Sequence, residues 1–227
     1  MNILYVDASL YEDSRTKGLA EYMLSKFGNE HNVKKIKLTE ENIPPLDIET
    51  LIRRTNLADE MNFDDPVFYY AKDYTNADMI LIAAPFWDLS FPAVLKLYIE
   101  AINIPNLVFK YDEEGNAIGL CQADRIVYIT TAGGKIDNEY GYEYIKTLAK
   151  KYHGIKHCDK IQAENLDIIN AKVEEELAKA RKKIDNLVEN IKKNIWPKRS
   201  DILYYLKNLP EYPKLIRILL YFRARQV

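Results

Sequence analysis

An aromatic loop follows one of the most apolar segments of the chain. The run 79–84 is apolar throughout, which predicts a strand buried on both faces and therefore a parallel sheet. Pro85 ends the run, and Phe86, Trp87, Asp88 and Leu89 follow it. This loop could lay an apolar wall and backbone amides beside a flat ligand with a polar edge. It could equally cap the core with aromatic side chains.

A second group of chemically useful residues follows the first predicted strand. Ser9, Ser14 and Thr16 supply hydroxyls, and Arg15 supplies a guanidinium, close to the expected start of a helix. Hydroxyls, one guanidinium and the free N–H groups of a helix start suit a phosphate monoester. The Gly-x-Gly-x-x-Gly and Walker patterns are absent from this loop. The alternative is that Ser14 and Thr16 only cap the helix.

A third loop lies after the strand predicted at 125–130. It contains Thr131, Ala132, Gly133 and Gly134. Two successive glycines allow the backbone to approach a ligand closely. They are also common in an ordinary tight turn.

Alternating strands and helices place the three loops together. The pattern predicts an α/β, flavodoxin-like, doubly wound five-stranded parallel sheet of order 2-1-3-4-5 with helices on both faces. In this order, the loops after strands one, three and four border one crevice, and their combined chemistry describes a flavin mononucleotide site. The predicted strands are 2–8, 33–38, 79–84, 125–130 and, at the sheet edge, 155–163. The predicted helices are 14–27, 47–61, 66–74, 92–102, 140–152 and 171–194, with a β-hairpin insertion at 108–120.

Composition excludes several classes of protein. The chain has 227 residues, 48% of them hydrophobic and 29% charged, with a net charge of −2. The overall charge therefore does not indicate nucleic-acid binding. Two cysteines make neither a disulfide framework nor a metal site. We find no signal peptide and no apolar run long enough to span a membrane, and we expect a cytoplasmic protein. His31, His153 and His157 lie outside the three loops and are interpreted as structural.

The chain is expected to have a core domain at 1–194 and a C-terminal extension at 195–227. The extension is basic and apolar, with seven Lys and Arg against two acidic residues. One hypothesis is a helix that makes weak contact with a membrane surface. The other is an arm that packs on its own subunit or on a partner.

Several motifs resemble one enzyme family over about residues 1–193. Segment 85–98 is similar to its Pro-Met-Tyr-Asn-Phe-x-x-Pro-x-x-Leu-Lys motif, and 131–134 stands where the family has Ser-Arg-Gly-Gly. Phe109, Tyr111, Gly115 and Gly119 resemble the family's hairpin, and Ser9, Ser14 and Thr16 its phosphate-binding residues. The family is that of the FMN-dependent NADH:quinone oxidoreductases, or azoreductases, within the flavodoxin-like quinone reductase superfamily.

The resemblance implies roles for individual residues. The FMN phosphate would contact Ser9, Ser14, Arg15 and Thr16. The isoalloxazine would be lined by Pro85, Phe86, Trp87, Asp88 and Leu89, mainly through backbone groups, and its polar edge by Thr131, Ala132, Gly133 and Gly134. Tyr111 and Tyr152 would form a substrate pocket over the flavin, across a homodimer interface.

The resemblance also implies the reaction. FMN rather than FAD would take hydride at N5 from NAD(P)H and pass two electrons to a quinone or azo compound, in ping-pong turnover and without a catalytic side chain. Asp88 replaces the family's Asn, Ala132 its Arg, and Ile136 a Tyr or His, which affects the choice of substrate. The alternatives are a flavodoxin-like electron carrier without its own NAD(P)H activity and a flavin-free binding module.

Overall fold

The computed structural model describes residues 1–28, 31–138 and 140–195. Its main feature is a five-stranded parallel sheet of order β2-β1-β3-β6-β7. This confirms the predicted fold and strand order, because β6 and β7 are the fourth and fifth strands of the prediction. The strands are β1 (Asn2–Asp7), β2 (Asn32–Lys37), β3 (Met79–Ala83), β6 (Arg125–Thr131) and β7 (His157–Ala163).

Burial follows the position of each strand in the sheet. All five residues of β3 are buried, and β1 is buried after its first residue, as expected for strands covered on both faces. β2 buries only Ile36, and β7 buries only Ile161 and Ala163. The predicted position of β7 at a sheet edge is confirmed.

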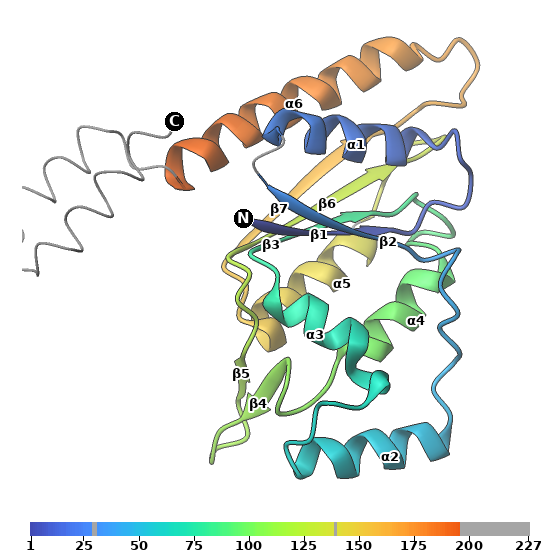
Figure 1. Ribbon diagram of the computed structural model, residues 1–227. Helices are drawn as coiled ribbons and strands as arrows, with labels where there is room; N and C mark the ends of the chain where they lie inside the picture. Colours follow the sequence, from blue (N-terminus) through green and yellow to red (C-terminus); the bar gives the residue numbers. More distant parts are fainter. Residues whose placement is uncertain (29–30, 139, 196–227) are drawn as a thin grey trace, which may run out of the picture. The chain divides into compact units, whose positions relative to one another are not determined.

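Helices cover both faces of the sheet (Figure 1). One face carries α1 and the first part of α6, and the other carries α3, α4 and α5. The helices are α1 (Arg15–Phe27), α2 (Ile48–Asp59), α3 (Tyr69–Asn76), α4 (Ala93–Ile102), α5 (Tyr140–Leu148) and α6 (Val173–Ile195).

Capping residues explain where several helices differ from the prediction. Ser14 and Asp47 are N-caps, whose side chains accept hydrogen bonds from Lys17 N and Thr50 N, so α1 and α2 each begin one residue later than predicted. Segment 66–74 is a 3-10 turn, η1 (Pro66–Phe68), followed by α3.

The predicted helix at 140–152 is interrupted near its end. After α5 the chain continues as a π-turn, η2 (Ala149–His153). Gly154, in the left-handed conformation, ends this helical segment. The hairpin prediction is confirmed: β4 (Phe109–Tyr111) pairs with β5 (Ala117–Gly119), and Gly115 in the turn has a φ of 81°. A Cβ on Gly119 would lie 2.1 Å from backbone atoms of His153 and Gly154. The hairpin therefore packs directly on the π-turn.

The described chain falls into two units, 1–184 and a second that begins at Asp185 within α6. The first unit contains the sheet and the site described below. Residues 196–227, on which the predicted extension almost wholly falls, lie outside the described residues. The helices in the described ranges are all too short or too polar to cross a membrane.

Candidate functional site

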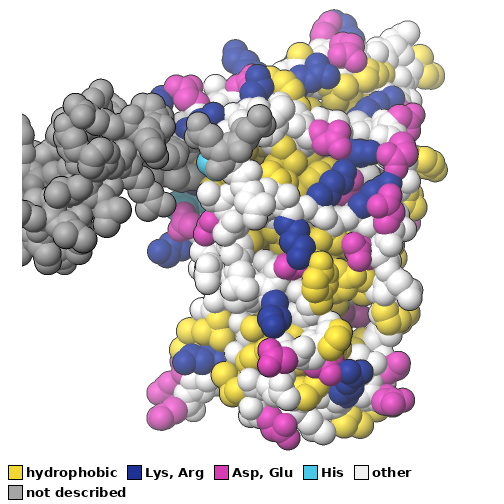
Figure 2. Space-filling model, viewed as in Figure 1, with side chains coloured by type: hydrophobic (Ala, Val, Ile, Leu, Met, Phe, Trp, Pro, Cys, Tyr) yellow, Lys and Arg dark blue, Asp and Glu magenta, His cyan; other side chains and the backbone are white. Residues whose placement is uncertain are grey.

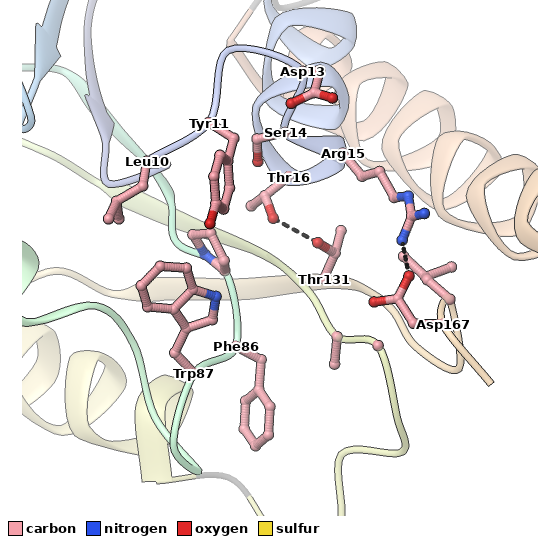
Figure 3. Close-up of a pocket in the computed structure, with 14 residues that line it drawn as sticks. Leu10, Tyr11, Asp13, Ser14, Arg15, Thr16, Phe86, Trp87, Thr131 and Asp167 are labelled. Atoms are coloured by element: carbon pink, nitrogen blue, oxygen red, sulfur yellow. Dashed lines mark hydrogen bonds and ion pairs between the residues drawn. The ribbon is translucent and has the colours of Figure 1, made fainter.

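A cavity of about 260 Å³ opens at the carboxyl ends of β1, β3 and β6, where the sheet order predicts a ligand crevice (Figure 3). Residues from four loops line it. They are Leu10, Tyr11, Asp13, Ser14, Arg15, Thr16, Pro85, Phe86, Trp87, Thr131, Ala132, Gly133, Leu166 and Asp167.

All three predicted loops contribute to this cavity, but not every predicted residue does. The lining includes Ser14, Arg15, Thr16, Pro85, Phe86, Trp87, Thr131, Ala132 and Gly133. The structure places Ser9, Asp88, Leu89 and Gly134 in the same loops but outside the lining, and Tyr111 and Tyr152 elsewhere.

Ser9 is buried behind the first loop. Its backbone N–H donates to Oδ1 of the fully buried Asp7 at 3.0 Å. Its hydroxyl is buried without a hydrogen-bond partner. Ser9 and Asp7 thus fix the path of the chain as it leaves β1, and neither side chain reaches the cavity lining.

The start of α1 supplies donors to the cavity. The first helical backbone bond runs from Gly18 N to Ser14 O at 2.9 Å, so the N–H groups of Arg15 and Thr16 have no intrahelical acceptor. The first turn contains no acidic residue. This helix end therefore favours an anion. Ser14 also caps the helix, so the two alternatives for this residue are compatible.

A hydroxyl pair joins the first and third loops. Thr16 Oγ1 and Thr131 Oγ1 are 2.6 Å apart, and Thr16 is fully buried. Figure 3 shows this bond joining the start of α1 to the end of β6. It holds the two loops at a fixed separation.

The aromatic loop is a tight turn. Trp87 N donates to Ser90 O at 3.2 Å, and Ser90 N donates to Trp87 O at 2.8 Å. The two central residues, Asp88 and Leu89, have φ values of 48° and 67°, as a type I′ turn requires. Asn and Asp tolerate this conformation better than other non-glycine residues, so Asp88 can replace the family's Asn without altering the turn.

Side chains rather than backbone amides of this loop face the cavity. The N–H of Phe86 donates to Thr131 O at 2.9 Å, and that of Trp87 is used by the turn. The indole of Trp87 extends toward Leu10 and Tyr11 and is 37% exposed, whereas the ring of Phe86 points away from the hydroxyls of Thr16 and Thr131 (Figure 3). Both residues line the cavity, and Trp87 provides an apolar wall for a flat ligand.

A fourth loop, which joins β7 to α6, was missed by the sequence reasoning. Its backbone pairs with the double-glycine loop through Asn165 N to Gly134 O and Asp167 N to Gly133 O, both at 2.9 Å. The carboxylate of Asp167 accepts a hydrogen bond from Arg15 Nη1 at 2.7 Å. Its sequence contains no recognised motif. The sheet order could have indicated this loop, because the loop after strand five must lie beside the loop after strand four.

The two tyrosines predicted to form a substrate pocket across a homodimer interface cluster at the hairpin. Phe109 packs edge-to-face against Tyr111 and Tyr152, with ring centroids 5.5 and 5.3 Å apart. Tyr111 is 56% exposed. Within one subunit, this cluster is separate from the cavity lining.

His153, the last residue of η2, is buried in a hydrogen-bond network. Its Nδ1 lies 2.9 Å from Tyr74 Oη, and its Nε2 lies 2.8 Å from Asn103 Oδ1. Because Asn103 Nδ2 donates to Ile99 O, Oδ1 must accept, so Nε2 carries the proton and Tyr74 donates to Nδ1. Burial lowers the pKa of His153 from 6.5 to about 4. The contacts are those of a structural histidine. Elsewhere in the described ranges, no cluster of His, Cys, Asp or Glu could hold a metal ion.

Comparisons with known proteins support the fold. A family model described as having a flavodoxin-like fold matches residues 1–188. An FMN-dependent NADH:quinone oxidoreductase 2 of Clostridium perfringens is 31% identical over 195 residues, which cover 82% of this chain and 98% of that protein. One of the same name from Clostridium acetobutylicum is 34% identical over 183 residues, 76% of this chain and 90% of that protein. The crystal structure of an azoreductase from Bacillus anthracis matches with a TM-score of 0.73 at 22% identity, over 84% of this chain and 99% of that one, and supports the fold.

Proposed function

The chain belongs to the family of the FMN-dependent NADH:quinone oxidoreductases, and we propose that it binds FMN in the cavity beside α1. We propose further that it catalyses the two-electron reduction of quinones or azo compounds by NAD(P)H. One observation carries the proposal: a helix N-terminus with hydroxyls and an aromatic wall border the same cavity. When bound, FMN would accept hydride from NAD(P)H at N5 and pass two electrons to the acceptor.

The residues at one end of the cavity fit the phosphate of this cofactor. Ser14, Thr16 and Thr131 provide hydroxyls, and the first turn of α1 provides N–H groups. Arg15 provides the positive charge. A phosphate monoester is satisfied by this combination of donors. Ser9 would act indirectly, by fixing the loop through Asp7.

The residues at the other end fit a flat ring system. Phe86 and Trp87 would pack against the ring, while Ala132 and Gly133 would border its polar edge. Asp88 and Leu89 would hold the turn that positions Trp87. An apolar slot of this kind favours flat, conjugated acceptors. A single open face would require donor and acceptor to bind in turn, which is ping-pong kinetics.

A homodimer would bring the hairpin aromatics to the site. Tyr111 is exposed and lies outside the cavity of its own subunit, so it and Tyr152 would act on the site of a partner. The exposed apolar side chains of Ile48 and Ile52 on α2 also suit a subunit interface. We place the enzyme in the cytoplasm. A weak membrane contact through residues 195–227 remains a prediction.

The enzyme is favoured over a simple electron carrier because the relatives are named as NADH-dependent oxidoreductases. The test is the visible spectrum of the purified protein, release of its flavin for mass measurement, and steady-state NADH oxidation with menadione. We expect a yellow protein, the mass of FMN, and menadione-dependent turnover. A protein that stays colourless after incubation with FMN would refute flavin binding. A yellow protein without NADH or NADPH oxidation would indicate the carrier.

A further inference from the structure

We propose that Asp167 lowers the affinity of the cavity for a phosphate monoester by competing with it for the Arg15 guanidinium. This inference rests on the proposed function, because it concerns the phosphate of the bound flavin. It assigns a role in cofactor affinity to a residue of the fourth loop.

The charges that line the cavity do not match those of a phosphate. Among the residues that the structure describes, Arg15 is the one Lys or Arg that lines the cavity, whereas two acidic residues, Asp13 and Asp167, line it. A phosphate monoester carries close to two negative charges at pH 7. The ligand and the Asp167 carboxylate would therefore share the Arg15 guanidinium.

The guanidinium of Arg15 is already engaged. Its Nη1 donates to Asp167 Oδ1 at 2.7 Å. Figure 3 shows the Arg15 side chain extended toward Asp167 and away from the hydroxyls of Ser14 and Thr16. A carboxylate and a phosphate bind guanidinium through the same N–H donors, so the two acceptors compete.

The carboxylate of Asp167 is held at this position by its own loop. The backbone N–H of Asp167 donates to Gly133 O at 2.9 Å. A Cβ on Gly133 would lie 2.5 Å from Asp167 Oδ2. Because glycine has no Cβ, Gly133 leaves room for this carboxylate beside the cavity.

Competition explains the position of Asp167 better than orientation of Arg15 does. A carboxylate that orients an arginine for a ligand lies behind the guanidinium, on the side away from the ligand. Asp167 instead lines the same cavity as Arg15. The two side chains are 65% and 41% exposed, and exposed ion pairs are weak, so a phosphate can displace the carboxylate.

The test uses the flavin-free full chain, titrated with FMN and with riboflavin, which lacks the phosphate. Quenching of flavin fluorescence gives each Kd. In Asp167→Asn, we expect FMN to bind about three- to tenfold more tightly, which is about 0.7 to 1.4 kcal/mol, and riboflavin binding to stay unchanged. In a protein that already carries Arg15→Gln, adding Asp167→Asn should leave the Kd for FMN nearly unchanged. Asp65→Asn is the matched control, because Asp65 pairs with Arg53 outside the cavity lining, and it should change neither Kd.

Three results would overturn the inference. Weaker FMN binding by Asp167→Asn would mean that Asp167 orients Arg15. An unchanged Kd for FMN would mean that the carboxylate has no influence. An equal gain for FMN and riboflavin would mean that the effect does not involve the phosphate. If the unmodified protein binds neither flavin, the proposed function fails as well, so the two failures are distinguishable.

Discussion

Acidification should destabilise the fold through one buried side chain, His153. It is 2% exposed, and burial lowers its pKa to about 4. In the unfolded chain the same imidazole has its ordinary pKa of about 6.5. Between these two values the unfolded chain binds a proton that the folded chain does not, so stability falls as the pH falls.

The magnitude follows from the two pKa values. One pKa unit corresponds to about 1.4 kcal/mol, so a difference of about 2.5 units amounts to about 3 kcal/mol when fully expressed. This contribution is fully present above pH 6.5 and is lost as the pH approaches 4. By linkage, about 2 kcal/mol of it is already lost at pH 5.

Chemical denaturation at pH 7.5 and pH 5 measures this loss, with His153→Asn as the comparison. Other titrating groups are common to both proteins, so the unmodified protein should lose about 2 kcal/mol more than the variant. Because His153→Asn removes contacts to Tyr74 and Asn103, it could fail to fold. NMR of the unmodified protein then serves as a second measurement, since the chain has three histidines to assign. Parallel stability profiles, or titration of His153 near pH 6.5, would refute the reasoning.

Three substitutions test packing at the hairpin, within α1 and at the cavity wall, and chemical denaturation measures each. Gly119→Ala should destabilise by about 3 kcal/mol, because its Cβ would meet the backbone of η2 at 2.1 Å. Gly18→Ala, within α1 and with no atom near its Cβ, should instead stabilise by about 0.5 to 1 kcal/mol; if it also destabilised the protein, the argument from space would be wrong. Thr16→Val should cost about 1 kcal/mol, because it breaks the part-buried hydrogen bond to Thr131. Thr55→Val on the exposed surface of α2 is its control and should change stability by less than about 0.5 kcal/mol.

The sheet and the position of the site could be predicted because burial determines both. Strands β1 and β3 are covered on both faces, so they appear in the sequence as continuous apolar runs. Parallel strands place their following loops at one edge, and this brought Arg15, Trp87 and Gly133 into one cavity. Ser14 could be predicted as a cap from its residue type and its place before the helix.

Other features depend on contacts that local patterns do not encode. Asp167 follows a polar edge strand without any motif, and its partner Arg15 is 152 residues away in the sequence. The π-turn ends at His153, whose hydrogen-bond partners lie on α3 and after α4. Ser9 has the residue type of a phosphate ligand, but it is buried and lies outside the cavity lining.

The balance of charges at the cavity indicates which interactions would hold a phosphate. Asp13 and Asp167 line it, and Asp167 already accepts a hydrogen bond from Arg15, so the positive charge of Arg15 is compensated before a ligand binds. Neutral donors are not affected in this way, because hydroxyls and backbone N–H groups carry no net charge that a carboxylate could compensate. The hydroxyls and the α1 N-terminus would therefore provide most of the phosphate affinity, and Arg15 would contribute fully only when Asp167 releases it. On this proposal, the fourth loop would modulate an anion site that the first loop builds.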